Sequence, residues 1–144
     1  RVLADRGQCL VASPALVDRL GFPAAPAALS TWPSLGLGIL QQIHAWALLG
    51  PDGANVTLHH TPRFVTTDMI ALRDAAVAGV GVVQLPIVIA RDQLAAGSLV
   101  RLVPDWAPRR EIIHAVFPSR RGLLPSVRAL IDFLTQRFEM LHED

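Results

Sequence analysis

The sequence predicts an α/β fold with a mixed sheet, and three observations support this. Short apolar segments alternate with segments whose apolar residues recur at helical spacing, along most of the 144 residues. The short crossovers between these segments favour largely parallel strand pairing. A turn signal at 51–55 joins two strand-like segments into an antiparallel hairpin over 44–60, which makes the sheet mixed.

The first predicted unit is a strand over residues 8–12 followed by a helix. Ser13 is a good N-cap, and Pro14 suits the first helical position because its missing N–H would have no helical partner there. We expect Gly21 to close this helix as a left-handed cap. The connector FPAAPAALSTWP then predicts one helical turn around residues 26–30.

The later elements are predicted from apolar spacing and from the Gly and Pro residues that bound them. Strands are expected at 34–39, 44–50, 56–61, 63–67, 82–85, 98–103 and 112–117. Helices are expected at 68–78, 87–96 and about 125–140, and Gly79 and Gly97 end the first two. One face of the last helix is expected to pack into the core, and it carries Val127, Leu130, Ile131, Leu134 and Phe138.

Composition excludes several classes of protein. Apolar residues make up 51% of the chain and charged residues 17%, which excludes disorder. No apolar run approaches the roughly 18 residues that span a bilayer, and the opening RVLADRGQC lacks the apolar stretch of a secretion signal. The net charge is +1, and the arginine pairs at 109–110 and 120–121 are too few for tight nucleic-acid binding. We interpret these pairs as solvated surface, although they could hold an acidic ligand.

The single cysteine, Cys9, is expected to be a small buried hydrophobe.

Polar residues stand where a predicted strand ends and the next helix begins, at Thr66, Thr67 and Asp68. In open α/β sheets, ligands collect beyond the carboxyl ends of strands, and a helix start offers free backbone N–H groups to an anion. The strand after this helix would bring Gln84 and Pro86 to the same edge. These residues predict a small-molecule cleft. A second interpretation stays open, in which Thr67 or Asp68 only caps the helix.

We expect no metal, no cofactor and no enzymatic activity from this chain. His59 and His60 would point to opposite faces of a strand, so they could not easily share one ion. A nucleophilic Ser13 would lack the backbone N–H that an oxyanion hole takes from the next residue, because that residue is Pro14. His114 lies on an apolar strand, and we interpret it as a core or cleft residue.

Five segments occur in the order typical of one known family: LVASPALVDRLGFPAAPAAL, WALLGPDG, TTDMIALRDAAVAGVGVVQLP, LAAGSLVRLVPDW and FPSRRGLLPSVRALIDFL. Together they cover nearly the whole chain. The sequence resembles the C-terminal effector-binding domain of LysR-type transcriptional regulators. This resemblance implies a fold like that of type 2 periplasmic binding proteins, in which two α/β lobes with mixed sheets are joined by two crossover strands.

The resemblance also implies a division of the chain between lobes. Residues 1–35 would form part of lobe I, residues 36–113 lobe II, and residues 114–144 the return strand and C-terminal helix of lobe I. The crossovers would lie near 34–37 and 113–115. The family's DNA-binding region and the first part of lobe I would be absent, so we expect an N-terminally truncated chain whose open sheet edge makes it self-associate.

The function implied by the resemblance is the sensing of a small, anionic or aromatic metabolite between the lobes. Binding would change the geometry of a dimer or tetramer in the cytoplasm, and thereby DNA binding by a winged helix-turn-helix outside this chain, with no role for a membrane. The alternative is a solute-binding protein of a transport system with the same fold. Effector contacts are expected from Trp32, Ser34, Leu35, Gly36, Thr66, Thr67, Asp68, Gln84 and Pro86.

Overall fold

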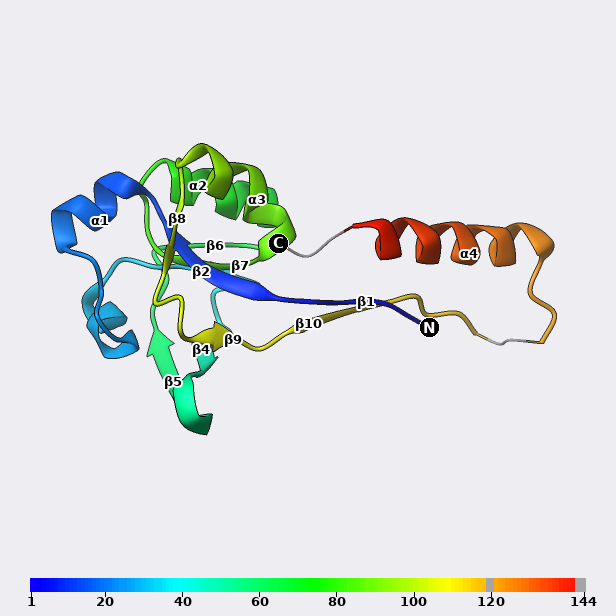
Figure 1. Cartoon of the computed structure of the whole chain (residues 1–144), viewed down its shortest axis with the longest axis horizontal. Helices are drawn as coiled ribbons and strands as arrows, with labels where there is room; N and C mark the ends of the chain where they lie inside the picture. Colours follow the sequence, from blue (N-terminus) through cyan, green and yellow to red (C-terminus); the bar gives the residue numbers. More distant parts are fainter. Residues whose placement is uncertain (119–120, 142–144) are drawn as a thin grey trace.

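The computed structural model describes residues 1–118 and 121–141 (Figure 1). The strands are β1 Val2–Arg6, β2 Gln8–Ala12, β3 Leu35–Leu37, β4 His44–Leu49, β5 Asn55–His60, β6 Phe64–Thr66, β7 Val83–Pro86, β8 Val100–Leu102, β9 Ala107–Pro108 and β10 Glu111–His114. The helices are α1 Pro14–Leu20, α2 Met69–Val77, α3 Ile87–Ala96 and α4 Pro125–Met140, with short 3-10 turns η1 Pro26–Thr31 and η2 Pro51–Gly53. Every helix and strand predicted from the sequence is present, and β1 and β9 are additional.

The main body, built from β2 to β9 with α1, α2 and α3, has β2 at the centre of its sheet. β2 pairs antiparallel with both β7 and β8. β3 pairs parallel with β6, and a parallel bridge between Ser34 and Val82 links β3 to β7. The expectation of largely parallel pairing is therefore wrong. Short strand–helix–strand crossovers favour parallel pairing of consecutive strands. β2 does not pair with the next strand of the chain, and its partners β7 and β8 are distant in sequence and antiparallel to it.

The hairpin predicted over residues 44–60 is confirmed. β4 and β5 pair antiparallel, from His44 opposite His60 to Leu49 opposite Asn55. At the turn Asp52 has a φ of 57°, in the left-handed region that Asp tolerates better than most residues. β9 pairs with the other edge of β4, so the hairpin becomes a three-stranded sheet.

The core consists of two apolar clusters, and β2 contributes to both. Because successive side chains of a strand point to opposite faces, Leu10 and Ala12 pack into the cluster beneath the hairpin. Cys9 and Val11 pack into the other cluster, with residues of α2 and α3. Cys9 is 1% exposed, as predicted, and forms no disulfide among the described residues.

Helix ends in the body follow the predicted capping residues, with one difference. The hydroxyl of Ser13 accepts the N–H of Leu16 at 3.2 Å, and Gly97 ends α3 in the left-handed conformation. Gly21 has the expected positive φ of 83°, but its ψ of 148° is extended, so it does not form the predicted left-handed cap. The chain therefore leaves α1 in an extended direction.

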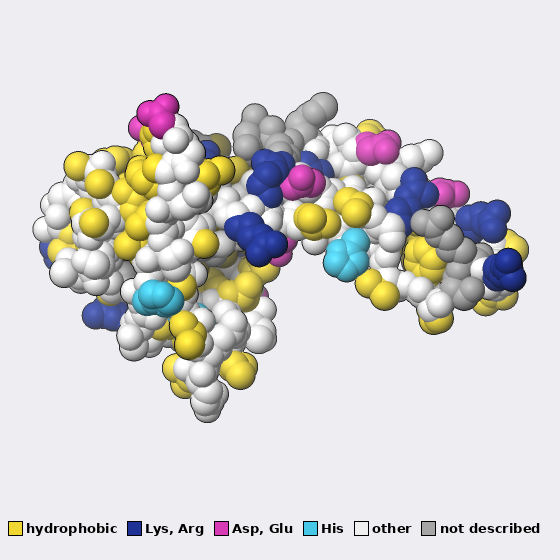
Figure 2. Space-filling model, turned by 90° about the horizontal axis from the view of Figure 1, so that it is seen from below, with side chains coloured by type: hydrophobic (Ala, Val, Ile, Leu, Met, Phe, Trp, Pro, Cys, Tyr) yellow, Lys and Arg dark blue, Asp and Glu magenta, His cyan; other side chains and the backbone are white. Residues whose placement is uncertain are grey.

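A two-stranded ribbon, β1 paired antiparallel with β10, extends from the body toward α4 (Figure 1). The Arg6 guanidinium donates to the carbonyls of Phe138 and Leu141 at 2.6 and 2.8 Å, at the end of α4 where carbonyls lack the regular helical bond. The space-filling view shows a larger and a smaller part joined by a narrower middle (Figure 2). No helix in residues 1–118 and 121–141 is long and apolar enough to cross a bilayer.

Two expectations about buried side chains in this region are wrong. Leu130 on α4 is 55% exposed, and only Ile131 of the predicted apolar face is buried. His114, at the end of β10, is exposed and is not a core residue, while its place in a cleft stays a prediction. The reason is that α4 packs mainly against β1 of the ribbon, so a narrow part of its apolar face is covered.

The sheets do not divide where the two expected lobes would meet. β2 falls in the range expected for lobe I, residues 1–35. It nevertheless pairs on both sides with strands of the range expected for lobe II, residues 36–113, namely β7 and β8. Residues 34–37 lie inside the main body, where β3 pairs with β6. The strands that link the body to α4 are β1 and β10.

Candidate functional site

The carboxyl ends of the parallel strands β3 and β6 lie at one edge of the body. β2 runs antiparallel to its neighbours, so its first residue, Gln8, reaches the same edge opposite Pro86 at the end of β7. A hollow of about 170 Å³ opens there, between the sheet and the β4–β5 hairpin. We call it the edge hollow. Its lining includes Gln8, Leu35, Gly36, Trp46, His60 and Gln84.

His60 is the best-fixed polar side chain of the edge hollow. Its Nδ1 lies 2.7 Å from the hydroxyl of the buried Ser34. Its ring stacks on Trp46 with 4.0 Å between the ring centroids. Burial, and then the nearby charges of His44 and His59, lower the pKa of His60 from 6.5 to about 4. At neutral pH this imidazole is therefore uncharged and offers hydrogen bonds rather than a cation.

Gly36 provides space for its neighbours in the wall of the edge hollow. A Cβ at this position would lie 2.7 Å from the His44 ring and 2.9 Å from Cγ of Pro62. The His44 ring is held in turn, because its Nε2 donates to the carbonyl of Ile39 at 3.1 Å. A larger residue at Gly36 would displace the ring that shapes this wall.

A second hollow, of about 560 Å³, adjoins the edge hollow and shares His44 and His60 with it. Ser34 and Trp32 also line it. Trp32 is only 9% exposed and belongs to the core beneath the hairpin, so it presents a small part of its ring. Its expected contact with an effector remains a prediction.

The start of α2 lies outside both hollows. The backbone N–H of Asp68 donates to the hydroxyl of Thr66 at 3.1 Å. The Asp68 carboxylate accepts the N–H groups of Ile70 and Ala71 at 2.9 and 3.2 Å, so it caps the helix. Whether Thr67 or Asp68 also contacts an effector stays a prediction. Thr67 is exposed. Pro86 is buried in the sheet and lines neither hollow.

The structure thus brings together part of the predicted set. Ser34, Leu35, Gly36, Gln84 and Trp32 surround His60, while Thr66, Thr67, Asp68 and Pro86 lie apart from it. In the sequence His60 stands out only as a possible metal ligand, and no pattern there points to Gln8. The alternation of β5 places His60 on its inner face, but its partners Ser34 and Trp46 come from other segments and are known only from the fold.

Comparison with known proteins gives the family. The family profile described as "LysR substrate binding domain" matches residues 1–139, and the chain belongs to this family. It is therefore homologous to the effector-responsive regulatory domains of LysR-type regulators, as the sequence resemblance implied. This match supports a regulator and not the transport alternative.

Individual relatives agree with the family. An HTH-type transcriptional regulator of Xanthomonas campestris is 31% identical over 131 residues, which are 88% of this chain and 38% of that protein. YagP of Escherichia coli, a putative LysR family substrate binding domain-containing protein, is 27% identical over 92% of this chain and 88% of its own length. The full-length virulence activator AphB of Vibrio cholerae superposes with a TM-score of 0.82 at 26% identity, over 96% of this chain and 47% of that one.

The chain thus spans less than half of the Xanthomonas regulator and of AphB. Its architecture is that of LysR-type regulatory domains, with a periplasmic-binding-protein-like fold. These proteins are transcriptional regulators, a class that generally has no enzymatic activity.

Proposed function

We propose that the edge hollow is this domain's half of an effector site, and that the effector binds between the main body and a second lobe. The observation that carries this proposal is the meeting of Gly36, Gln84 and the uncharged His60 at the carboxyl edge of the sheet. At about 170 Å³ the hollow is smaller than a typical complete ligand pocket. The surface of the second lobe that faces the edge hollow would complete the pocket.

The lobes are then best divided at the ribbon. Residues 7–110 would form one lobe, because β2 to β9 share the two clusters of the main body. β1 and β10 would be the two crossover strands, and α4 would belong to the other lobe. This division replaces the boundaries at 35 and 113 and keeps two lobes and two crossovers.

The lining of the edge hollow favours an aromatic part of the effector on this side. Among the described lining residues none is acidic, arginine or lysine, and the polar groups are amides and imidazoles. Trp46 and His60 offer ring surfaces. An anionic group of the same effector would be held by the facing lobe, and the exposed Thr67 hydroxyl could donate a hydrogen bond to it.

The effector would act by binding one relative orientation of the lobes better than another, since a ligand shifts an equilibrium only by its differential affinity. The resulting change in a homo-oligomer would alter DNA binding by a winged helix-turn-helix elsewhere in the protein, in the cytoplasm. We propose no catalytic role and no cofactor for this chain.

A thermal-shift screen of aromatic carboxylates and phenols on the protein that carries this domain tests the proposal. A ligand found in the screen should bind about tenfold more weakly to Gln84→Leu, because the amide bonds are lost. Gln136→Leu, on the exposed surface of α4, should bind it normally. Equal affinity for Gln84→Leu and the unmodified protein would exclude the edge hollow as the effector site.

A further inference from the structure

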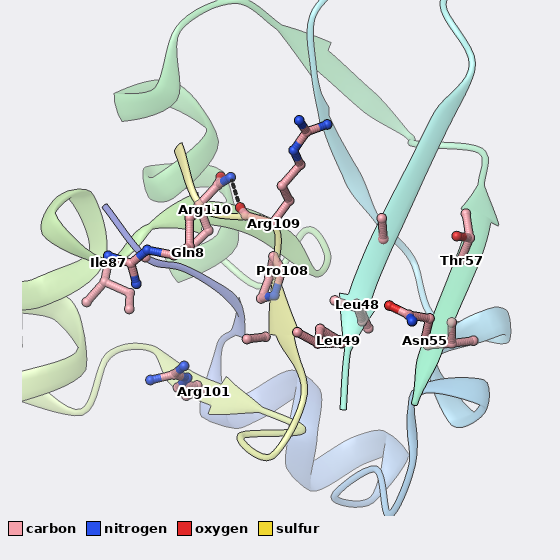
Figure 3. Close-up of a pocket in the computed structure, with 14 residues that line it drawn as sticks. Gln8, Leu48, Leu49, Asn55, Thr57, Ile87, Arg101, Pro108, Arg109 and Arg110 are labelled. Carbon is pink, nitrogen blue, oxygen red and sulfur yellow. Dashed lines mark hydrogen bonds between the residues drawn. The ribbon is translucent and has the colours of Figure 1, made fainter. Parts of the chain in front are cut away.

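A third hollow, of about 600 Å³, lies where the ribbon joins the main body. One wall is the face of the β4–β5 hairpin with β9, and the other is formed by β8 and the start of α3 (Figure 3). We call it the arginine hollow and define it by Leu48, Val56, Ile87, Arg101, Pro108 and Arg109. Nothing in the proposed effector site assigns a role to it.

Most of the lining of the arginine hollow is apolar. Leu48 and Pro108 lie opposite each other in the β4–β9 ladder, and Val56 and Ile87 add aliphatic surface. Its size falls in the range of small-molecule pockets, which combine such a lining with a few polar groups that fix orientation. The hollow therefore suits a ligand with an apolar body.

The charged side chains that line the arginine hollow are all positive. Arg101, Arg109 and Arg110 line it, and none of the lining residues in the described part of the chain is Asp or Glu. Arg110 already pairs with Asp5, with 2.8 Å between Nε and Oδ1. Arg109 is exposed, and in Figure 3 its guanidinium lies well apart from that of Arg101. The hollow thus has cationic groups at separate places around an apolar surface.

Arg101 is the polar group that most clearly requires a ligand. Its side chain is half-buried, and within residues 1–118 and 121–141 it has neither a hydrogen bond nor an ion pair. A partly desolvated guanidinium without a partner costs free energy. A carboxylate offsets that cost best, because it accepts two parallel N–H bonds from the planar guanidinium.

We propose that the arginine hollow is a second binding site, specific for an amphipathic carboxylate with an aromatic or aliphatic body. Arg101 holds the carboxylate, the hairpin face packs against the body, and Arg109 attracts the anion at the rim. The apolar walls leave most oxygens of a phosphate or a sugar without partners, so these ligands fit poorly. This site goes beyond the proposed effector site.

The two sites are neighbours, and Gln8 lines both. Its Nε2 donates to the carbonyl of Arg109 at 2.7 Å, the bond drawn in Figure 3. Occupancy of one site can therefore affect the other, and by linkage any such effect is reciprocal. To distinguish binding at the arginine hollow from binding at the edge hollow, the test must include a variant of each site.

Isothermal titration calorimetry of the protein that carries this domain tests the proposal with octanoate as the probe. Acetate lacks the apolar body, 1-octanol lacks the charge, and inorganic phosphate is charged but has neither a carboxylate nor an apolar body. We expect octanoate to bind at least about tenfold more tightly than each of the three, because each lacks a contact of the hollow. Failure of octanoate to bind, or equal binding of phosphate, overturns the proposal.

Single substitutions test whether octanoate binds in the arginine hollow. Arg101→Gln should weaken octanoate about tenfold or more, since hydrogen bonds to charged groups are the strong ones. Arg19→Gln removes an exposed arginine at the end of α1 and should bind octanoate normally. Loss of binding in Arg19→Gln equal to that in Arg101→Gln overturns the site, and so does loss of octanoate binding in Gln84→Leu.

Circular dichroism checks that each variant is folded. If Arg101→Gln does not fold, Arg109→Gln decides, because the exposed side chain of Arg109 can be replaced without disturbing the core. We expect it to weaken octanoate binding about threefold, the effect of a screened rim charge. Affinity unchanged in Arg109→Gln would then overturn the proposal.

Discussion

The hydroxyl of Ser34 and Nδ1 of His60 lie 2.7 Å apart although 26 residues separate them in the sequence. This bond joins the start of β3 to the end of β5, and so fixes the hairpin against the sheet. It also holds the imidazole of His60 on Trp46, at the wall shared by the two hollows.

Ser34→Ala should therefore lower stability. Ser34 is 1% exposed, so its removal leaves the His60 nitrogen without a partner, at a cost of about 1–3 kcal/mol in the free energy of unfolding. Urea denaturation measures this cost. Ser126→Ala, at an exposed position near the start of α4, is the matched control, and equal losses in the two variants would contradict the importance of the bond.

Stability should fall on acidification because of His60. Its pKa is about 4 in the folded protein against 6.5 in the unfolded chain, mainly because of burial. Between pH 6.5 and 4 the unfolded chain binds the proton and the folded protein does not, so the free energy of unfolding decreases as pH falls through this window and levels off below it. His60→Gln should show a smaller decrease between pH 7 and 4.5, measured by urea denaturation. The same decrease in both proteins would show that His60 is not responsible.

Thr67→Val should weaken the response to an inducer without lowering the melting temperature. The side chain is exposed and Asp68 caps the helix, so the fold does not depend on the Thr67 hydroxyl. A reporter-gene dose–response curve of the protein that carries this domain measures the effect. An unchanged curve would remove Thr67 from the effector site.

Leu72→Ala should cost roughly 2–5 kcal/mol, the usual cost of a buried Leu-to-Ala change, because Leu72 on α2 is 0% exposed. Leu130→Ala should cost less than about 1 kcal/mol in this chain, because Leu130 is 55% exposed. Thermal denaturation of the two variants compares the losses. A larger loss for Leu130→Ala would mean that α4 is covered by a surface other than the ribbon.

The 144-residue chain should self-associate. In the described residues β1 and β10 pair only with each other, so each has an open edge. Val2 and Ile112 expose 61 and 58% of their surface along the ribbon, and Val116 just after it exposes 84%. Open apolar strand edges pair with other chains. Sedimentation velocity should show mass increasing with concentration. A monomer at high concentration would contradict this prediction.

The sequence determined the local structure of this protein and its family. Ser13, Pro14, Asp68 and the alternating residues of β4 and β5 act through contacts a few residues apart, so their helix ends and strands could be predicted. The order of the five family-like segments in turn predicted the class of domain, which the family match confirms.

Only the tertiary structure decided which strands became neighbours. β2 lies between β7 and β8, and no local preference encodes a pairing across so many residues. The Ser34–His60 bond, the place of Arg101 in the arginine hollow and the place of Gln8 between two hollows all follow from that pairing. Which apolar side chains of α4 are buried likewise depended on the element that packs against this helix. Periodicity marks an apolar face, but it does not tell how much of that face another element covers.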